Sequence, residues 1–536
     1  MTTLSDIRAE LQRAQEQLDA AYRAQETART AILMAMAKLK LMTDSPMLTG
    51  DVQEMVTGMI PLKSDGVEIL PAAIRPHLPE PMLNVTPKIE VVSTPVVSEP
   101  LTITEEWQHT LDTLLNGSEH VFCTGGAGVG KTTMLEQVVT QYPGNLMVVA
   151  FTGVAALRAG GSTIHREFRF KTEALARDDV TAITDPRKAL MMRKVDALLI
   201  DEISMVRADV MDAIDISLQK TRNNKQPFGG VRILAFGDLF QLPPVSTDKK
   251  EQTWLKHRYG VQLPYFFHAE CWRDQQPKIM ELTTVFRQKD ADFAGALNAI
   301  RNGTMTPEHL SLINSRVNYN FVAPTDELWL ELTTTNDAAA RANEKMLGSI
   351  KSDPRFFEAM VMGDFKDKDM PTDRNLQLKV GAVVMFVKND AERRWVNGTM
   401  GKVTNLDPLY IQTANGAEHQ VDPVSWVSVG YEYDEEKKKL TSYERGKFTQ
   451  IPVKVAAAIT VHKSQGSSFD RCIVNMPNTF ASGQGYVALS RCRTLPGMVL
   501  RHRLKDVDVK VDPEVVKFMR GEPIAKPEVI TQGTLL

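Results

Sequence analysis

The spacing of apolar and polar positions changes along this chain of 536 residues, and each change predicts a different kind of structure. Residues 4–42 follow a heptad pattern, which predicts a coiled-coil helix over residues 1–42. Alanine fills each d position from Ala14 to Ala35, so the seam is thin. Self-association, docking on a protein partner and a solvated helix remain open. The heptad positions, with one polar exception at Gln25, are Leu4, Ile7, Leu11, Ala14, Leu18, Ala21, Gln25, Ala28, Ile32, Ala35, Leu39 and Met42.

Periodicity ends after this segment. Between residues 43 and 100, prolines recur among Ser, Thr and Val, which is typical of a flexible linker. Short apolar patches such as "VEILPAAI" are an alternative, as docking motifs. From Leu101 onward, apolar strands ("HVFCT", "LMVVAF", "VDALLIDE", "VRILAFGD") alternate with helical segments, which predicts a parallel sheet covered by helices.

A region with a different pattern of apolar and polar residues interrupts this α/β pattern. Residues 380–452 contain "GAVVMFVKN", "GKVTNL", "LYIQT", an Asn-Gly turn and "WVSVGYEY", which alternate like the strands of a small antiparallel barrel. Strong α/β patterning resumes at Ala456. We therefore expect the β-barrel to be inserted into an α/β lobe.

Composition narrows the class of protein. With 43% hydrophobic and 24% charged residues, the chain can bury several cores, and a net charge of −3 confines any nucleic acid to a local groove. The four cysteines form no CxxC pair, which argues against a zinc site or a disulfide framework. The N-terminus lacks a signal-peptide core, and no apolar stretch reaches the ~18 residues of a membrane helix. We expect no membrane partner and a cytoplasmic protein, nuclear or organellar if eukaryotic.

One glycine-rich stretch predicts a phosphate site. "GGAGVGKTT", from Gly125 to Thr133, follows the strand "HVFCT" and precedes the helical "MLEQVV", which is the context of a P-loop. Its backbone amides would surround phosphates at a helix N-terminus. Lys131 would reach the β and γ phosphates, and Thr132 would place its hydroxyl on Mg²⁺.

Carboxylates follow another strand of the expected sheet. The apolar run of "ALLIDEISM" places Asp201 and Glu202 at the carboxyl edge, where ligands bind in open α/β sheets. Asp201 suits the Mg²⁺ shell, and Glu202 suits orientation and deprotonation of an attacking water. The next strand ends in "GDLFQLPPV", which places Gln241 where its amide can sense the γ-phosphate. The role of Glu202 favours hydrolysis over transfer to a small substrate.

These strings, in this order, resemble the Pif1-type helicases of superfamily 1, the 5′-to-3′ branch that includes RecD and Dda. The resemblance covers about residues 101–500. It rests on "TEEWQHTLD", "FTGVAALRAGGSTIHREF", "MVRADVMDAIDISLQKTRNNKQPFGG", "TTVFRQKDADFAGALNAIRNG", "TTTNDAAARAN", "WVNGTMGKV", "TVHKSQGSSFD" and "GQGYVALSRCR" as well as the phosphate motifs. It implies an ATP-dependent DNA helicase.

The resemblance implies an architecture of two RecA-like lobes with ATP between them. The first lobe would span residues 101–275 with a small wedge at about 169–192, and the second 276–536 with the barrel at about 388–452. Arg287 and Arg491 would be arginine fingers, which typically contribute about 10³ to 10⁵ in rate. An ordinary surface salt bridge is the alternative for either residue, and Gln108 would read adenine.

The family pattern also implies residues along a single strand of DNA. Hydroxyl, amide, imidazole and aromatic side chains suit binding to phosphates and bases without sequence preference. Phe168 could equally be a core residue. Arg166 and Glu167 replace the small and aromatic pair usual after the histidine, which puts base stacking there in doubt, and Val129 replaces a threonine in the P-loop. The strand residues expected are Thr152, His165, Phe168, Thr334, Asn336, His462 and Ser464.

The stretch "AAAITVHKSQGSSFD" would face both ligands. His462 lacks a second metal-binding side chain nearby, and Glu202 already fills the role of general base. We therefore expect His462 and Ser464 to face the strand, and Gln465 and Gly466 to face the nucleotide. The full set of expected ATP-binding residues is Gln108, Gly125, Gly126, Ala127, Gly128, Val129, Gly130, Lys131, Thr132, Thr133, Gln465 and Gly466.

Three functions compete at this point. The first is a 5′-to-3′ helicase acting on single-stranded and forked DNA. The second is a DNA-stimulated ATPase or loading subunit that does not unwind DNA by itself. The third is a scaffold with a degenerate motor, and the intact motor residues speak against it: Lys131, Asp201, Glu202, Gln241 and Arg491.

Overall fold

The computed structural model describes residues 104–246, 248–273, 275, 277–284, 290–324, 326–477 and 481–524. The chain divides into two units, Met1–Glu99 and Pro100–Leu536. The predicted coiled coil and linker lie outside the described residues, and so does Arg287. Those expectations stay predictions.

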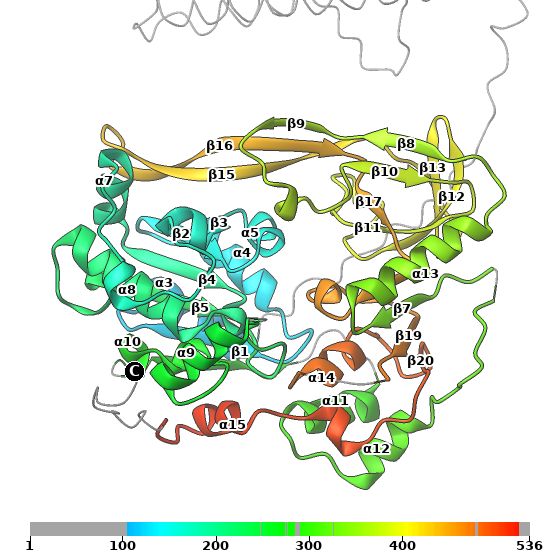
Figure 1. Cartoon of the computed structure of the whole chain (residues 1–536), viewed down its shortest axis with the longest axis horizontal. Coiled ribbons are helices and arrows are strands. Elements are labelled where there is room, and N and C mark those ends of the chain that lie inside the picture. Colours follow the sequence, from blue (N-terminus) through cyan, green and yellow to red (C-terminus); the bar gives the residue numbers. More distant parts are fainter. Residues whose placement is uncertain are drawn as a thin grey trace, which may run out of the picture. The chain divides into compact units, whose positions relative to one another are not determined.

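A six-stranded parallel sheet forms the centre of the first lobe, as predicted (Figure 1). Its strand order is β3-β2-β4-β5-β1-β6, and every pairing in it is parallel. The carboxyl ends of its strands therefore share one edge, where ligands bind in such sheets. The strands are β1 (Val121–Gly125), β2 (Leu146–Ala150), β3 (Ser162–Thr163), β4 (Ala197–Asp201), β5 (Arg232–Phe236) and β6 (Lys278–Leu282).

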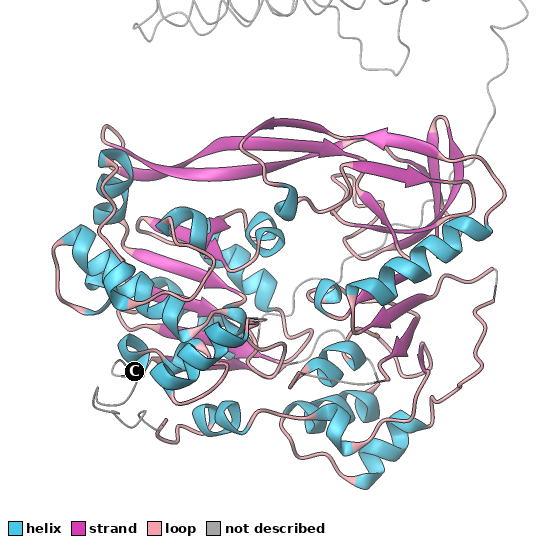
Figure 2. Cartoon of the chain, viewed as in Figure 1, coloured by secondary structure: helices cyan, strands magenta, loops and turns pink. Residues whose placement is uncertain are grey.

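Helices cover this sheet and connect its strands (Figure 2). Several begin at side-chain caps, such as Thr104 before the first and Asp185 before a helix that starts at Pro186. The predicted wedge region of residues 169–192 contains a 3₁₀ turn and most of one helix. The helices are α3 (Glu105–Asn116), α4 (Lys131–Gln141), α5 (Gly153–Arg158), α6 (Ile164–Phe168), η3 (Arg177–Asp179), α7 (Pro186–Lys194), η4 (Ile203–Met205), α8 (Ala208–Arg222), η5 (Pro227–Gly230), α9 (Lys249–Tyr259), η6 (Phe266–His268) and α10 (Glu270–Arg273).

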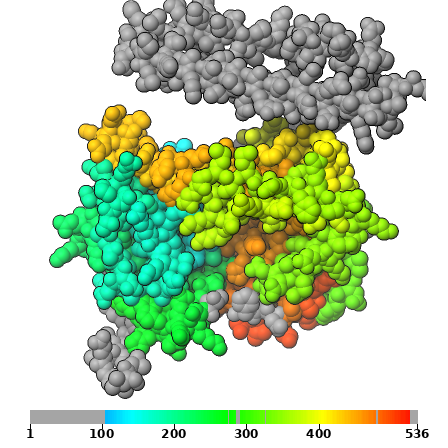
Figure 3. Space-filling model, turned by 45° about the horizontal axis from the view of Figure 1, so that its top comes forward, coloured from blue at the N-terminus to red at the C-terminus, as the bar shows by residue number. Residues whose placement is uncertain are grey.

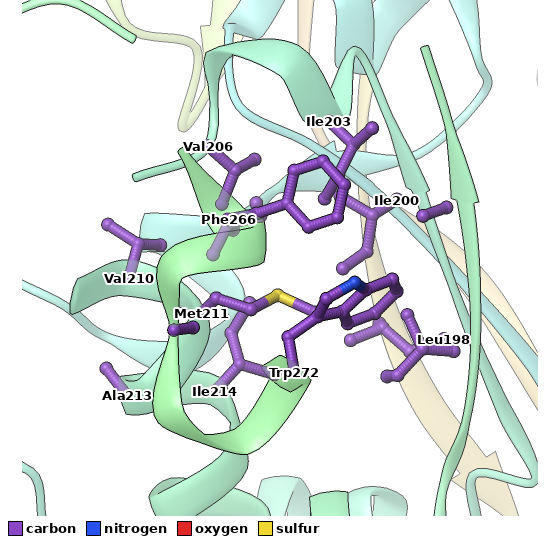
Figure 4. Packing of buried hydrophobic residues seen from close by; sticks show 14 of the residues in the cluster. Leu198, Ile200, Ile203, Val206, Val210, Met211, Ala213, Ile214, Phe266 and Trp272 are labelled. Atoms are coloured by element: carbon purple, nitrogen blue, oxygen red, sulfur yellow. The ribbon is translucent and has the colours of Figure 1, made fainter. Parts of the chain in front are cut away.

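Both faces of the six-stranded sheet are buried, which explains the unbroken apolar runs of its strands. Leu198 and Ile200 of β4 belong to one core cluster, and Ala197 and Leu199 belong to the other. Figure 4 shows Leu198 and Ile200 packed with residues of α8 and with the Trp272 indole. This packing fixes the carboxyl end of β4, and with it the position of Asp201.

A smaller parallel sheet forms the second lobe, in the order β18-β7-β19-β20. Its strands are β7 (Leu330–Thr333), β18 (Ala458–Thr460), β19 (Cys472–Asn475) and β20 (Met498–Leu500). Its helices, with the C-terminal ones, are α11 (Ala291–Arg301), α12 (Pro307–Asn314), α13 (Asn336–Ser349), η8 (His462–Ser464), α14 (Gln484–Leu489), η9 (Asp506–Val509) and α15 (Pro513–Met519). No helix in the described part of the chain is both long and apolar enough to cross a membrane.

Two elements that follow the predicted boundary between residues 275 and 276 belong to the first lobe by their contacts. Strand β6 follows that boundary but pairs with β1 of the first lobe. Helix α15 also packs on the first lobe, where the ring of Phe518 stacks on Phe267 with centroids 4.4 Å apart. Sequence order alone therefore misplaces both elements, because a strand or helix joins the apolar surface that it fits.

The insertion in the second lobe is built from antiparallel strands. It runs from Arg355 to Val455, so it begins well before the expected start at residue 388. Its sheets have the orders β14-β13-β12-β11-β17, β15-β16-β9 and β10-β8. The strands are β8 (Arg355–Glu358), β9 (Met360–Gly363), β10 (Asn375–Leu378), β11 (Val383–Phe386), β12 (Met400–Leu406), β13 (Leu409–Thr413), β14 (Glu418–Gln420), β15 (Val424–Asp434), β16 (Lys439–Gln450) and β17 (Val453–Val455), with the turn η7 (Asp367–Asp369).

The long hairpin of β15 and β16 reaches the first lobe. The phenol of Tyr431 accepts a hydrogen bond from the amide of Val148 at 3.3 Å and donates one to its carbonyl oxygen at 3.2 Å. The Lys194 ammonium lies 5.6 Å from the ring centroid of Tyr433. In Figure 3 the orange end of the hairpin lies against the blue-green surface of the first lobe.

Candidate functional site

The loop between β1 and α4 has backbone conformations that favour glycine. Gly128 and Gly130 have φ of 81° and 88°, in the left-handed region. Gly130 is the N-cap of α4 and forms no side-chain cap bond. A Cβ atom at Gly125 would lie 2.5 Å from the carbonyl oxygen of Leu282. The first amides of α4 thus lack a side-chain acceptor, an arrangement that suits an anionic ligand.

The Lys131 side chain folds over this loop. Its Nζ donates to the carbonyl oxygens of Gly125 at 2.7 Å and Gly126 at 2.8 Å. Burial lowers the pKa of Lys131, and the charge of Asp238 opposes that shift. The amide of Ala127 donates to the phenol oxygen of Tyr486 at 2.9 Å. The ammonium and the amide both donate hydrogen bonds to oxygen atoms here. The phosphate oxygens of a nucleotide are acceptors of the same kind.

Asp201 and Glu202 form a carboxylate pair at the end of β4. Glu202 has a φ of 52°, which is uncommon for a residue other than glycine, and its amide donates to Asp201 Oδ1 at 2.9 Å. Burial, followed by repulsion from Glu202, raises the pKa of Asp201 to about 6. Arg158 opposes this shift, and a metal cation would reduce the repulsion in the same way. Carboxylate oxygen is the ligand type that Mg²⁺ prefers. Asp201 therefore fits the expected metal position.

Gln465 joins the two lobes at this carboxylate pair. Its Nε2 donates to Glu202 Oε2 at 3.2 Å and to Gln241 Oε1 at 3.4 Å. Gln241 in turn donates to Asp238 Oδ2 at 3.1 Å. Gly466 follows with a φ of 77°. The structure thus brings Lys131, the Asp201–Glu202 pair, Gln241 and Gln465 together from four separate stretches of the sequence.

Arg491 is near this cluster but its guanidinium is held within the second lobe. Only 2% of the residue is exposed. Its nitrogens donate to the carbonyl oxygens of Val487 at 2.8 Å and Ser467 at 3.1 Å, and to Ser490 Oγ at 2.9 Å. In this state Arg491 orders the loop that carries Gln465. The surface salt-bridge alternative is excluded by its burial.

The residues predicted to contact single-stranded DNA have different surroundings. Thr152 is the N-cap of α5, where its hydroxyl accepts from the amide of Ala155 at 3.2 Å. His165 of α6 meets the Phe151 ring edge to face. His462 is half-buried on η8. Burial lowers the pKa of both histidines, which favours the neutral imidazole.

Two further residues predicted to contact single-stranded DNA flank the end of β7. Thr334 is half-buried, and Asn336 is exposed as the first residue of α13. Gln108, expected at adenine, is exposed on α3 and donates to Asp112 Oδ1 at 3.0 Å. Their contacts with DNA and adenine stay predictions.

Phe168 and Ser464 are both buried. Phe168 is 4% exposed in the core of the first lobe and stacks on Phe170 at 5.3 Å. The core alternative is therefore the correct one for its ring. Ser464 is fully buried, and its hydroxyl donates to the carbonyl oxygen of Val461 at 2.7 Å. The prediction of a strand contact at Ser464 is wrong for this structure, because its hydroxyl closes the turn of η8.

Sequence reasoning missed three side chains at the site. Arg158 of α5 contacts both carboxylates of the pair, and Tyr486 of α14 reaches the P-loop. Arg301 of α11 donates to Asp238 Oδ1 at 3.2 Å, and its guanidinium lies 4.6 Å from the Phe240 ring centroid. All three lie in the quoted motif strings, but no local pattern links them to their partners.

Comparison with known proteins identifies the family. The family model "PIF1-like helicase" matches residues 103–310, and "DNA helicase Pif1, 2B domain" matches residues 367–406. The chain is 34% identical to the ATP-dependent DNA helicase PIF1 of Mus musculus over 78% of its length, and it spans 62% of that protein. It is 31% identical to the ATP-dependent DNA helicase Pif1 of Bdellovibrio bacteriovorus, over 76% of this chain and 89% of that one. The chain belongs to the Pif1-like helicases.

A solved Pif1 structure extends the likeness to the fold. Pif1 from Bacteroides sp. in complex with ADP-AlF4 is 34% identical, with a TM-score of 0.72 over 78% of this chain and 96% of that one. The same Bacteroides protein bound to ssDNA gives a TM-score of 0.57 with the same coverage. The RecA-like α/β architecture expected from the motifs is therefore confirmed for this Pif1-like chain. The "2B domain" match falls within the antiparallel insertion.

Proposed function

We propose that this chain is an ATP-dependent DNA helicase that moves 5′ to 3′ along single-stranded DNA and unwinds duplex ahead of it. The hydrogen bond from Gln465 to Glu202 carries the proposal, because it connects the expected strand-binding loop of the second lobe with the expected general base of the first. The Pif1 relatives support the DNA and ATP parts of the proposal.

The nucleotide side of the proposal assigns one task to each group. Lys131 and the amides of the P-loop would bind the β and γ phosphates of ATP, and Thr132 and Asp201 would hold Mg²⁺. When bound, Mg²⁺ would neutralise negative charge on these phosphates. Glu202 would orient the attacking water and take its proton, while Gln241 senses the γ-phosphate. Arg491 would reach the nucleotide as the lobes close.

The strand side of the proposal uses both lobes. Thr152 and His165 of the first lobe, with Thr334, Asn336 and His462 of the second, would contact successive phosphates of a single strand. Hydrolysis would alternately open and close the cleft, so that the lobes step along the strand. The wedge at residues 169–192 would separate a fork.

Unwinding polarity is the direct test. We expect ATP-dependent separation of a forked duplex with a 5′ single-stranded tail and little separation of the matched duplex with a 3′ tail. Lys131→Ala is the control, because it removes the ammonium that contacts the P-loop carbonyls and should abolish unwinding of both. Strand separation is measured by loss of fluorescence quenching between labelled strands.

The outcomes separate the competing functions. Unwinding from the 3′ tail alone would contradict the polarity. ATP hydrolysis that is stimulated by the strand without separation of either duplex would favour a translocase or loading subunit.

His462→Ala tests the proposed link between strand and nucleotide. We expect about 2- to 10-fold weaker single-strand binding, the range for loss of one hydrogen bond, and a matching loss of DNA-stimulated ATP hydrolysis with basal hydrolysis largely retained. Fluorescence anisotropy of a labelled oligonucleotide and phosphate release measure the two effects. His257→Ala, at an exposed imidazole on α9, is the control. An equal fall of basal and stimulated rates would show that His462 acts on the nucleotide instead.

A further inference from the structure

Arg158 forms ion pairs with both members of the carboxylate pair. Its Nη2 lies 2.9 Å from Glu202 Oε1 and 3.2 Å from Asp201 Oδ2, so one nitrogen bridges both side chains. Burial opposes a charge here, yet Glu202 and Asp201 hold the pKa of Arg158 above its ordinary value. The guanidinium is therefore a permanent positive charge at the expected Mg²⁺ ligand.

The second lobe closes over the same guanidinium. A Cβ atom at Gly466 would lie 2.1 Å from Arg158 Nη1, so a larger residue at this position would displace the guanidinium. Glu202 is thereby engaged on both oxygens, with Arg158 on Oε1 and Gln465 on Oε2. In this arrangement the expected general base has both oxygens occupied by donors.

Helix α5 connects Arg158 with a residue that is expected to contact single-stranded DNA. Its six residues run from Gly153 to Arg158, about 9 Å at the rise of an α-helix, and its N-cap is the expected strand contact Thr152. The insertion also touches this helix, since a Cβ atom at Gly153 would lie 2.1 Å from Asp369 Oδ1. A displacement at either place would move the guanidinium relative to Asp201.

We propose that Arg158 is a positioning residue that holds Asp201 and Glu202 until a bound strand shifts α5. Resting on the proposed function, this assignment explains how strand binding could reach the metal and water positions. The guanidinium occupies Asp201 Oδ2 and Glu202 Oε1, so these carboxylates would be less available to Mg²⁺ and to water. When α5 moves, both carboxylates become free for the metal and the water.

Nucleotide binding provides a readout that does not depend on turnover. Full-length protein is titrated with Mg²⁺ in the presence of a fluorescent, non-hydrolysable ATP analogue, with and without an oligothymidine strand. For the wild type we expect the strand to lower the half-saturating Mg²⁺ concentration. For Arg158→Ala we expect that concentration to be at least about threefold lower without the strand, and to respond little to the strand.

Two other variants sharpen the result. Arg158→Lys keeps the charge and should restore part of the strand response. Arg258→Ala removes another partly buried arginine of the first lobe, 30% exposed against 29% for Arg158 and paired with Glu270, and should behave like the wild type. Phosphate release should show a raised basal rate and a reduced stimulation for Arg158→Ala alone.

An unchanged Mg²⁺ requirement together with a normal strand response in Arg158→Ala would overturn the proposal. A wild type that binds nucleotide with Mg²⁺ and responds to the strand, but unwinds neither fork, would overturn the helicase assignment and leave the role of Arg158 supported. The two failures are therefore distinguishable.

Discussion

Glu202→Gln is expected to slow DNA-stimulated ATP hydrolysis by about 10²- to 10⁴-fold, the range for loss of a general base. Glutamine keeps the length of the side chain and can still accept a hydrogen bond from Gln465 or Arg158, which contact the two carboxylate oxygens now. It cannot take a proton from water. Nucleotide affinity should therefore remain close to that of the wild type. Phosphate release and binding of a fluorescent ATP analogue measure the two quantities.

Glu136→Gln is the matched control for this prediction. It makes the same chemical change at an exposed position on α4 of the same lobe. Hydrolysis by Glu202→Gln within about threefold of the wild type would remove Glu202 from the role of base. Loss of nucleotide binding in parallel with hydrolysis would instead indicate that Glu202 holds the metal.

Glu167→Ala is expected to destabilise the attachment of the β15–β16 hairpin to the first lobe. The Glu167 carboxylate is fully buried, with Arg445 Nη2 at 2.9 Å from Oε1 and Lys188 Nζ at 3.2 Å from Oε2. Removing it leaves two partly buried cations without this partner, a change that typically costs about 3–5 kcal/mol. We expect a lower thermal midpoint and faster tryptic cleavage at the exposed Lys437 and Lys438 of the hairpin turn.

Glu444→Ala is the comparison for Glu167→Ala. Glu444 is an exposed carboxylate on β16, so its loss should change stability by about 0.5 kcal/mol at most. Equal cleavage rates in the two variants would show that Glu167 does not secure the hairpin. The prediction gives a structural role to the position where the motif departs from its family, since Glu167 with Arg166 replaces the expected small and aromatic pair. Arg166 also reaches the hairpin, where its Nη1 donates to Ser428 Oγ at 2.8 Å.

Burial is the property that sequence patterns predicted least well at the site. Phe168 and Ser464 lie in motif strings beside histidines that stay accessible, yet both are buried. A helical turn of a few residues places neighbours on opposite sides, and the motif alone does not say which side faces the ligand. The predicted boundary between the lobes was also wrong, because β6 pairs with β1 and so belongs to the sheet of the first lobe.

The sequence by itself determined the parallel α/β architecture, the P-loop and the carboxylate pair, because each depends on a strand and the residues that directly follow it. Lys131 and Asp201 are where their strings predict them. Only the tertiary structure decided which distant groups meet these residues. Gln465 contacts Glu202 although 263 positions separate them in the sequence. Arg158 also contacts Glu202, at a separation of 44 positions. Such contacts arise from the packing of whole sheets and lobes. The short-range periodicity of a sequence does not predict them.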